Sequence, residues 1–374
     1  MDANFPPMKV LMASTSFPAD AADWRGLFIR QMTFALARRR DLRLKTWCPP
    51  GQYPENIECA ASPEDEAWLS DMLKAGGIAH AVRTGSLNAV LRPLQLLIRL
   101  HALYRREKEA DVVHANWLQV ALPIPKDQRP LLVTVLGTDF RLLRLPGMRR
   151  LLRRVFSARR TVICPNAEWM VPDLRAAFGD IAEIHCVPFG IDEAYYSLVR
   201  RPEKPEQWLC ISRITTGKIG DLLVWGERYF KRNQRRLHLF GPMQESIHLP
   251  EWLSYHGPVS QSDLLAKWFP SATGLVSLSR HPEGRPQVML EAMAAGLPIV
   301  ASALPAHCSL LEPSGAGIVC KSQDEFGLAL EEIEQPESGV RFSAAGRAFA
   351  MQNFGTWDTC AARYAAIYRR LLTV

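Results

Sequence analysis

The sequence predicts an α/β fold made of two doubly wound domains, each a parallel sheet covered by helices. The chain has 374 residues, a length that suggests two domains. Short apolar runs alternate with helix-forming stretches in both halves of the chain, which is typical of parallel sheets with helical crossovers. Residues 272–303 show one complete unit of strand, loop, helix and strand. Because ligands of such sheets bind at the carboxyl ends of the strands, this unit is the first place to look for a site.

The first half begins with the apolar run 8–13, after which Gly26 opens a helix. A polar stretch, 51–77, interrupts the alternation, and a basic amphipathic helix follows at 91–108. Further strands are expected at 42–48, 111–116, 131–136, 161–165 and 184–188, with a helix at 166–177. The polar segment 200–205 contains two prolines and is the expected linker.

The second half has the same rhythm. Its strands are expected at 208–212, 237–241, 274–278, 299–301 and 317–320, and its helices at 288–295, 342–354 and 357–372. Gly296 ends the first of these helices, and Pro298 lies just beyond it. We therefore expect a first domain at 1–199, a second at 206–355 and a terminal helix at 356–374.

The composition is that of an ordinary globular protein, with 48% hydrophobic and 22% charged residues. The eight cysteines form no C-x-x-C pair and lie mostly in apolar runs, which indicates reduced cysteines in a cytoplasmic protein. The histidines are scattered, so no metal site is expected. The N-terminus does not have the pattern of a signal peptide, and no apolar run approaches the roughly 18 residues of a membrane span.

Two carboxylates lie eight residues apart in the unit 272–303, Glu283 in the loop and Glu291 in the helix. Between them, the amides of Gln287 and Val288 begin the helix, and such amides bind anions well. Carboxylates suit hydroxyl groups and helix-start amides suit phosphate, so a nucleotide sugar would satisfy both. The alternative is a glutamate that merely complements the helix dipole, beside an unrelated acidic residue in the loop.

The run from Glu283 to Ala301 resembles the E-x7-E signature of family 4 retaining glycosyltransferases, which have the GT-B fold. That fold has two Rossmann-like domains facing a central cleft. The resemblance implies that Glu283 lies near the hydroxyls of the donor sugar and that Glu291 binds the ribose. Arg285-Pro286 stands where many members have Phe-Gly, and Arg285 at the sugar end would suit an anionic sugar such as a uronic acid.

Other segments of the second half resemble the same family. Arg213 and Lys218 keep the five-residue spacing of the pair that binds the donor diphosphate. Gly257 falls in the segment whose backbone contacts the nucleotide base. A solvated basic turn is the alternative interpretation of the first pair.

In the first half, His114 ends a strand that resembles the family's D-[IV]-[IV]-H-x-H segment, with Asn116 in place of the second histidine. Asp139 belongs to a segment in which Leu136 replaces a histidine. Gly26 matches a loop glycine near the donor diphosphate and the acceptor. The resemblance implies a role for His114 at the sugar or acceptor, and for Asn116 and Asp139 on the acceptor side. The alternatives are a packed core histidine, a helix N-cap for Asp139 and a plain helix-start glycine.

The resemblance implies a retaining, metal-independent transferase with no cofactor other than its nucleotide-sugar co-substrate. It would move the sugar to a hydroxyl of a glycan or lipid-linked acceptor, in envelope polysaccharide or glycolipid synthesis. The alternatives are a catalytically silent nucleotide-sugar-binding or scaffold protein, a transferase for a small soluble acceptor, and an epimerase or phosphorylase of similar fold.

Residues 141–160 contain eight arginines and no acid. In a helix starting near Pro146, Arg149, Arg150, Arg153 and Arg154 gather on one face and apolar side chains on the other. This pattern predicts a peripheral protein on the anionic inner face of the cytoplasmic membrane. An ordinary surface helix is the alternative, and a nucleic-acid partner is not expected because the run offers no stacking platform.

Overall fold

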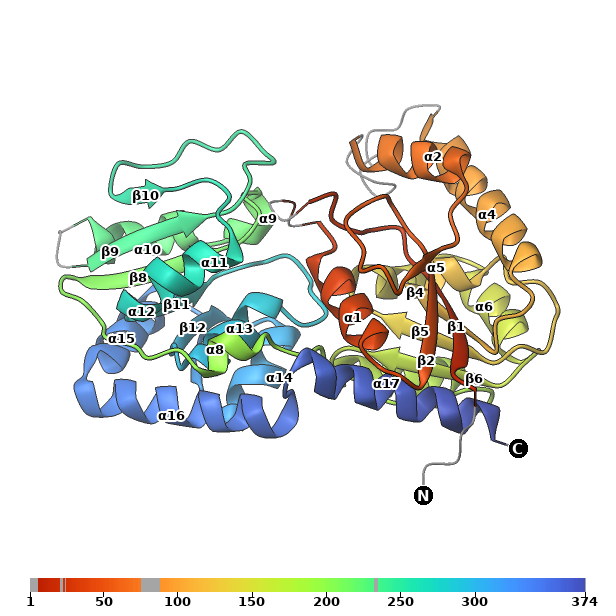
Figure 1. The fold of residues 1–374 in the computed structure, drawn as a ribbon. Coiled ribbons are helices and arrows are strands. Elements are labelled where there is room, and N and C mark those ends of the chain that lie inside the picture. The colour runs from red at the N-terminus through yellow and green to blue at the C-terminus, as the bar shows by residue number, and fades with distance from the viewer. Residues whose placement is uncertain (1–5, 21–22, 24, 75–87, 232–234, 374) are drawn as a thin grey trace, which may run out of the picture. The chain divides into compact units, whose positions relative to one another are not determined.

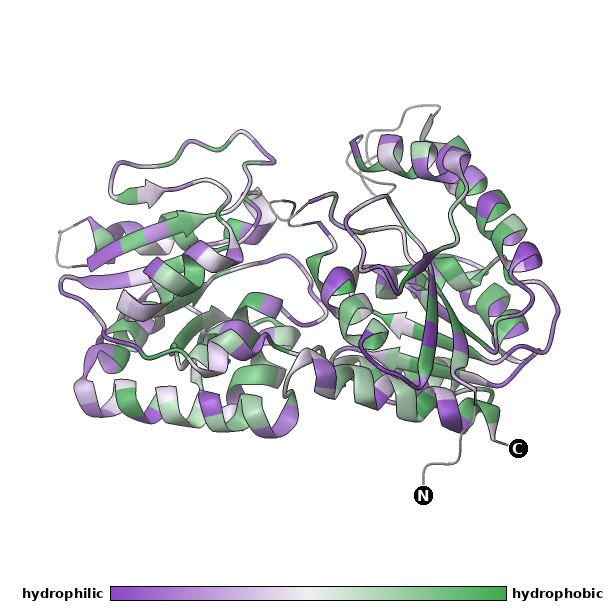
Figure 2. Ribbon diagram, viewed as in Figure 1, coloured by the Kyte–Doolittle hydropathy of each residue, from purple (hydrophilic) through white to green (hydrophobic). Residues whose placement is uncertain are grey.

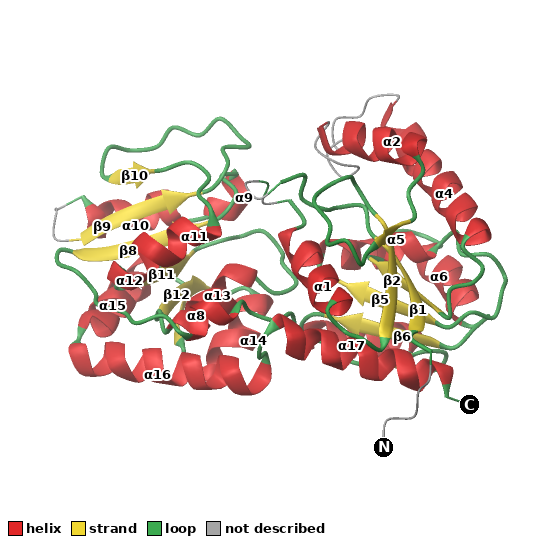
Figure 3. Cartoon of the chain, viewed as in Figure 1, coloured by secondary structure: helices red, strands yellow, loops and turns green. Residues whose placement is uncertain are grey.

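The computed structural model describes residues 6–20, 23, 25–74, 88–231 and 235–373. The chain divides into two compact units, each with its own parallel sheet. Unit 1 comprises Met1–Phe189 and Trp357–Val374, and unit 2 comprises Gly190–Thr356. This arrangement confirms the predicted fold class (Figures 1 and 3).

Unit 1 contains a seven-stranded sheet of order β3-β2-β1-β4-β5-β6-β7. All neighbouring strands are parallel. The strands are β1 (Met8–Ala13), β2 (Leu42–Trp47), β3 (Glu58–Cys59), β4 (Val112–Asn116), β5 (Leu131–Val135), β6 (Thr161–Pro165) and β7 (Glu183–Ile184). Strands β4, β5 and β6 are buried along their whole length, which explains why they are continuous apolar runs rather than alternating ones.

Helices cover both faces of this sheet because successive parallel strands require right-handed crossovers. One face carries α1 (Leu27–Ala37) and α17 (Trp357–Leu372), which pack together. The other carries α4, α6 and α7, which belong to the crossovers into β4, β6 and β7. The helical segments of this side are α2 (Pro63–Lys74), α4 (Asn88–Arg106), α5 (Leu118–Ala121), η1 (Thr138–Arg144), α6 (Met148–Phe156), η2 (Glu168–Met170) and α7 (Val171–Phe178).

Unit 2 contains a six-stranded parallel sheet of order β10-β9-β8-β11-β12-β13. The strands are β8 (Glu206–Ile211), β9 (Arg235–Phe240), β10 (Leu253–Tyr255), β11 (Gly274–Ser277), β12 (Ile299–Ser302) and β13 (Gly317–Cys320). The helices are α8 (Glu193–Tyr196), α9 (Thr216–Ile219), α10 (Leu222–Phe230), α11 (Gln261–Asp263), η3 (Leu264–Trp268), α12 (Phe269–Ser271), α13 (Gln287–Ala295), α14 (Pro305–Ser314), α15 (Gln323–Glu334) and α16 (Pro336–Asn353). The strand order reverses between β8 and β11, and doubly wound sheets bind ligands at such a reversal.

The units divide at Phe189/Gly190, before the residue 199 at which the first domain was expected to end. Ile191 is fully buried in the core of unit 2, and its backbone N–H donates to the carbonyl of Gly355 at 3.0 Å. Residues 200–205, the expected linker, also lie in unit 2, where the N–H of Arg201 donates to the carbonyl of Pro270 at 2.7 Å. The terminal helix α17 belongs to unit 1.

In Figure 2, hydrophobic residues follow the sheets and the helix sides that cover them. No helix in the described part of the chain combines the length and the apolar character that a membrane crossing requires.

Candidate functional site

Unit 2 contains a small pocket of about 110 Å³ at the carboxyl ends of β8 and β11. Five residues expected from the sequence to bind a ligand line it: Arg213, Lys218, Glu283, Gln287 and Val288. They come from the loop after β8, the loop after β11 and the first turn of α13. The pocket therefore lies at the strand reversal, where the topology favours a ligand site.

Lys218 reaches the pocket because the backbone folds tightly around it. The Thr215 side chain caps α9 by accepting a hydrogen bond from the N–H of Lys218 at 3.2 Å. Gly220 then ends the helix with φ +58°, and a Cβ at this position would lie 1.9 Å from the carbonyl oxygen of Leu278. Only glycine allows the end of α9 to approach the end of β11 this closely.

Lys218 and Glu283 form an ion pair, with 2.6 Å between Nζ and Oε1. The two side chains are only 14% and 15% exposed. Burial lowers the pKa of Lys218, and the charge of Glu283 opposes that effect. A cation and an anion held this close in a nearly dry pocket suit a ligand that offers both phosphate and hydroxyl groups.

The loop that carries Glu283 is anchored on both sides. The Ser302 hydroxyl, at the end of β12, donates to the carbonyl of Ser279 at 2.6 Å. The backbone N–H groups of Arg280 and His281 donate to the carbonyl of Gly217 in α9, at 2.8 and 3.1 Å. Glu283 is thus positioned by the same short helix that positions Lys218.

The start of α13 presents backbone donors to the pocket. The backbone hydrogen bonds of α13 begin with the N–H of Met289, which donates to the carbonyl of Pro286 at 3.1 Å. The N–H groups of Gln287 and Val288 come before this bond and therefore have no acceptor within the helix. The Gln287 side chain donates to the carbonyl of Gly190 at 3.0 Å, which holds the first turn in place. Pro286 lines the pocket but contributes no N–H.

Glu291 lies one turn further along α13, outside the lining of the pocket. Burial raises the pKa of its carboxyl group to about 8, hydrogen bonding from Tyr195 and Gln287 lowers it, and the charge of Asp192 raises it. No cation contributes to this balance. The raised pKa favours the protonated form of Glu291 at neutral pH.

Arg213 and Arg285 lie at the edges of this region. The Arg213 guanidinium is 3.5 Å from the side-chain oxygen of Gln244. Arg285 places its guanidinium 5.0 Å from the centre of the Phe354 ring. Gly257 follows β10, has φ +70° and accepts a hydrogen bond from the N–H of Gly241 at 2.8 Å; it does not line the pocket.

Comparison with known proteins places the pocket in a recognised domain. Residues 211–335 match the family described as glycosyl transferases group 1. This segment contains every lining residue except Cys210.

Unit 2 therefore contains a group 1 glycosyl transferase domain, and the chain is a glycosyltransferase with the GT-B fold.

Solved structures match nearly its whole length at low identity. The sucrose-phosphate synthase of Thermosynechococcus elongatus matches with a TM-score of 0.70 and 14% identity, over 97% of this chain and 99% of that chain. The N-terminal domain of trehalose-6-phosphate phosphatase from Candida albicans gives 0.72 and 12%, over 100% and 99%. HepE of Anabaena, solved in complex with UDP-glucose, gives 0.63 and 14%, over 96% and 100%. No curated protein sequence matches this glycosyltransferase significantly.

In unit 1 of the glycosyltransferase, the polar residues at the strand ends are engaged internally. His114 is fully buried, with Nδ1 2.7 Å from the Tyr368 hydroxyl and Nε2 2.5 Å from the Thr134 hydroxyl. Burial lowers the pKa of His114 to about 3, so the ring is neutral. Asn116 is also fully buried and donates to the carbonyl of Ala13 at 3.3 Å. Both side chains have the surroundings of core residues, which for His114 is the alternative that the sequence left open.

Asp139 is 4% exposed and accepts hydrogen bonds from the backbone N–H groups of Leu118, Leu136 and Gly137 at 3.1, 3.0 and 3.0 Å. Burial raises the pKa of its carboxyl group to about 6, although these donors favour the charged form. Asp139 thus holds two loops together. Gly26 precedes α1 with φ +73°, and a Cβ there would meet the Ser16 hydroxyl at 2.5 Å, so the tight turn requires glycine.

The four arginines expected to face a membrane divide into two pairs. Arg149 donates to the carbonyl of Ala176, and Arg153 pairs with Asp180, so these two bind α6 to α7. Arg150 and Arg154 are exposed and make no hydrogen bond or ion pair with a described residue.

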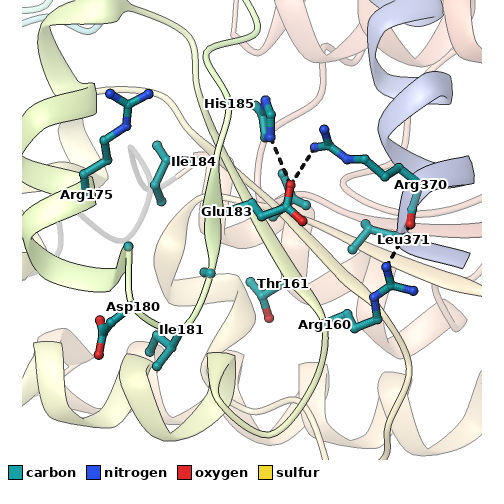
Figure 4. A pocket seen from close by; sticks show the side chains of 13 residues that line it. Arg160, Thr161, Arg175, Asp180, Ile181, Glu183, Ile184, His185, Arg370 and Leu371 are labelled. Atoms are coloured by element: carbon teal, nitrogen blue, oxygen red, sulfur yellow. Dashed lines mark hydrogen bonds and ion pairs between the residues drawn. The ribbon is translucent and has the colours of Figure 1, made fainter. Parts of the chain in front are cut away.

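A larger, open groove of about 760 Å³ lies at the β7 edge of unit 1. Figure 4 shows the Glu183 carboxylate between His185 and Arg370, at 3.1 and 3.0 Å. Arg160 donates to the carbonyl of Arg370 at 3.2 Å, at the end of α17. These charges satisfy one another, and none of the expected site residues lines the groove.

The sequence interpretation did not include Tyr195 or the side chain of Asp192, which act on Glu291. Their signal was their place in the chain: Asp192 ends the segment Phe189-Gly190-Ile191-Asp192, and Tyr195 follows three residues later. Among the residues that the structure describes, no three His, Cys, Asp or Glu side chains cluster as metal ligands would.

Proposed function

We propose that this glycosyltransferase transfers a sugar from a nucleotide diphosphate sugar to a hydroxyl group, with retention at the anomeric carbon and without a metal ion. The observation that carries the proposal is the Lys218–Glu283 ion pair in the pocket beside the start of α13. HepE was solved in complex with UDP-glucose, so UDP-sugars are the first donors to test.

The donor would exchange partners with this ion pair. Its diphosphate would take Lys218 from Glu283, and Glu283 would then accept a hydrogen bond from a sugar hydroxyl. Arg213 and the amides of Gln287 and Val288 would complete the diphosphate site, because each offers a donor at the edge of the pocket. Glu291 would bind the ribose.

The reaction would use these groups to stabilise the leaving nucleoside diphosphate. The bond between the anomeric carbon and the phosphate oxygen breaks, and its electron pair stays with the phosphate. The acceptor oxygen attacks from the same face and gives its proton to the departing phosphate. Lys218 and Arg213 would balance the growing negative charge, the task that metal ions perform in other transferases.

The acceptor we propose is a glycan or lipid-linked molecule of the envelope, reached from the cytoplasmic face of the membrane. Arg150 and Arg154 support this proposal because they carry charge that no described residue neutralises. Residues 141–160 contain no acidic residue, so every charged side chain of this segment is an arginine.

The test starts with a thermal-shift screen of nucleotide sugars, followed by measurement of nucleoside diphosphate release with the donor that binds. Lys218→Ala should lower the rate by about 10²–10³. Lys231→Ala is the matched control, since Lys231 also forms a Lys–Glu ion pair, at 3.0 Å with Glu227, but is 67% exposed and lies outside the pocket. Equal rates for both variants would refute the proposed role of Lys218.

Two further measurements test the mechanism. EDTA should leave the rate unchanged, and NMR of the product should show the anomeric configuration of the donor. A strict requirement for Mg²⁺ or Mn²⁺, or an inverted product, would overturn the mechanism. A protein that binds the donor but releases no nucleotide with any acceptor would instead be the silent binding protein.

A further inference from the structure

Helix α4 has an apolar stripe on the side that faces away from its sheet. Leu91, Leu94 and Ile98 are 51%, 55% and 60% exposed. They are three and four residues apart, so they lie on one face of the helix. Leu96 and Leu100 are buried and fill the opposite face, so the stripe is additional to the core-facing surface. Figure 2 shows both hydrophobic and hydrophilic residues along α4.

Helix α6 adds a second exposed surface on the same side of the sheet (Figure 1). Leu145 and Leu151 are 50% and 51% exposed. Arg150 and Arg154 flank Leu151 and remain unpaired among the described residues. The arginines that bind the α7 side, Arg149 and Arg153, lie on another flank of α6, so Arg150, Leu151 and Arg154 stay exposed.

We propose that the α4 stripe, Leu91, Leu94 and Ile98, enters the headgroup region of an anionic bilayer while the exposed arginines of α6 bind the lipid headgroups. The inference rests on the proposed membrane-linked acceptor and names the surface that reaches it. A helix that buries one face in its domain and presents apolar and basic residues on the other lies in the plane of a membrane interface.

The charge of this face selects the bilayer among the possible occupants. Neither of the segments 88–106 and 141–160 contains an acidic residue. Arg99 and Arg153 are neutralised by Asp65 and Asp180 from neighbouring elements. Arg105, Arg150 and Arg154 are exposed and have no acidic partner among the described residues. A second copy of the chain, docked symmetrically on this face, would bring these unpaired arginines together. A surface of anionic lipids satisfies the arginines and the apolar stripe at once.

The test is co-sedimentation of the full chain with vesicles of equal parts phosphatidylcholine and phosphatidylglycerol, and with vesicles of phosphatidylcholine alone. The stripe variant is Leu91→Ser, Leu94→Ser and Ile98→Ser. The matched control is Val224→Ser, Leu328→Ser and Val340→Ser, three apolar residues of unit 2 that are 69%, 66% and 70% exposed.

We expect wild type and control to bind anionic vesicles equally and the stripe variant to lose about tenfold or more in partitioning. Arg150→Glu with Arg154→Glu should also weaken binding and remove most of its salt dependence. Equal binding of stripe variant and wild type would overturn the inference, as would absence of wild-type binding. A wild-type dimer that the stripe variant dissociates, seen by sedimentation equilibrium, would assign the stripe to a second copy and overturn it too.

Donor hydrolysis without vesicles separates this inference from the proposed function. We expect equal hydrolysis in wild type, stripe variant and control, because no stripe residue lines the donor pocket. Failure of hydrolysis in all three proteins would count against the proposed function and leave the vesicle result to decide the inference.

Discussion

Replacing Lys218 by Met should separate the stability of unit 2 from its activity. The variant keeps the length of the side chain but leaves the Glu283 carboxylate, 15% exposed, without its cation. Removing one partner of a buried ion pair typically costs 3–5 kcal/mol. Since water still reaches part of this pair, we expect a loss of roughly 2–4 kcal/mol in the free energy of unfolding.

The double variant Lys218→Met with Glu283→Gln removes both charges, so most of that stability should return. Catalysis should stay low by about 10²–10³, because neither the diphosphate nor the sugar regains its partner. Urea denaturation measures the stability, and nucleoside diphosphate release measures the activity. The single variant Glu283→Gln completes the cycle and gives the coupling energy between the two side chains.

Two results would refute this reasoning. If Lys218→Met unfolds at the wild-type urea concentration, the ion pair makes no net contribution to the pocket. If the double variant recovers activity together with stability, the pair supports the fold only, and the catalytic groups lie elsewhere.

Three other changes test separate parts of the structure. The pKa of Glu291 is about 8 in the folded chain against an ordinary 4.5, so the folded chain binds more protons than the unfolded chain and wild-type stability should fall between about pH 4.5 and 8. At 1.36 kcal/mol per pKa unit the fall is up to about 5 kcal/mol. Denaturation curves at pH 5 and pH 9 should show this fall in the wild type and not in Glu291→Gln. Gly220→Ala places a methyl group 1.9 Å from the carbonyl of Leu278, so urea denaturation should show a loss of about 1–3 kcal/mol, and an unchanged midpoint would contradict the close approach. Asp139→Ala leaves three backbone N–H groups without their hydrogen-bond acceptor, so the free energy of unfolding should fall by roughly 3 kcal/mol in the same assay. A loss of activity at full stability would instead point to a role of Asp139 in binding the acceptor substrate.

The pocket in unit 2 could be predicted because its parts are close in sequence. Glu283, Gln287 and Val288 share one loop and one helix start, so the local pattern of strand, loop and helix brings them together. Lys218 lies in α9, which follows another strand, β8, and only the resemblance to a known family placed it in the site. The adjacency of β8 and β11, which brings Lys218 to Glu283, depends on the topology of the whole sheet.

The strand ends of unit 1 show what the local pattern cannot give. His114 lies in β4, two residues before its end, and its surroundings depend on Tyr368, which lies 254 residues later in the chain and whose hydroxyl contacts Nδ1. A pattern within one strand contains no information about the helix that covers it. Asn116 bonds the carbonyl of Ala13, 103 residues earlier in the chain. Asp139 is held by nearer residues, since its three backbone donors lie 2 to 21 residues away.

Some elements had local signals that the interpretation passed over. The polar stretch 51–77 contains α2, whose first turn carries Glu64, Asp65 and Glu66 and whose last turn carries Lys74. This charge order complements the helix dipole. The expected helix at 342–354 is the second part of α16, which begins at Pro336, a favourable first helical position.

The two glutamates of the signature have different neighbours, and the surroundings of Glu291 make ligand binding sensitive to pH. Glu283 pairs with Lys218, whereas Glu291 is buried and its pKa is raised to about 8. Ribose hydroxyls that donate to Glu291 would stabilise its charged form and lower its pKa, so binding of a nucleoside diphosphate at pH 7 should release a proton from this group. Calorimetry in two buffers with different ionisation enthalpies measures that release. Glu291→Gln should lower the proton release by about one per site, and an equal release in wild type and variant would rule out a ribose contact that ionises Glu291.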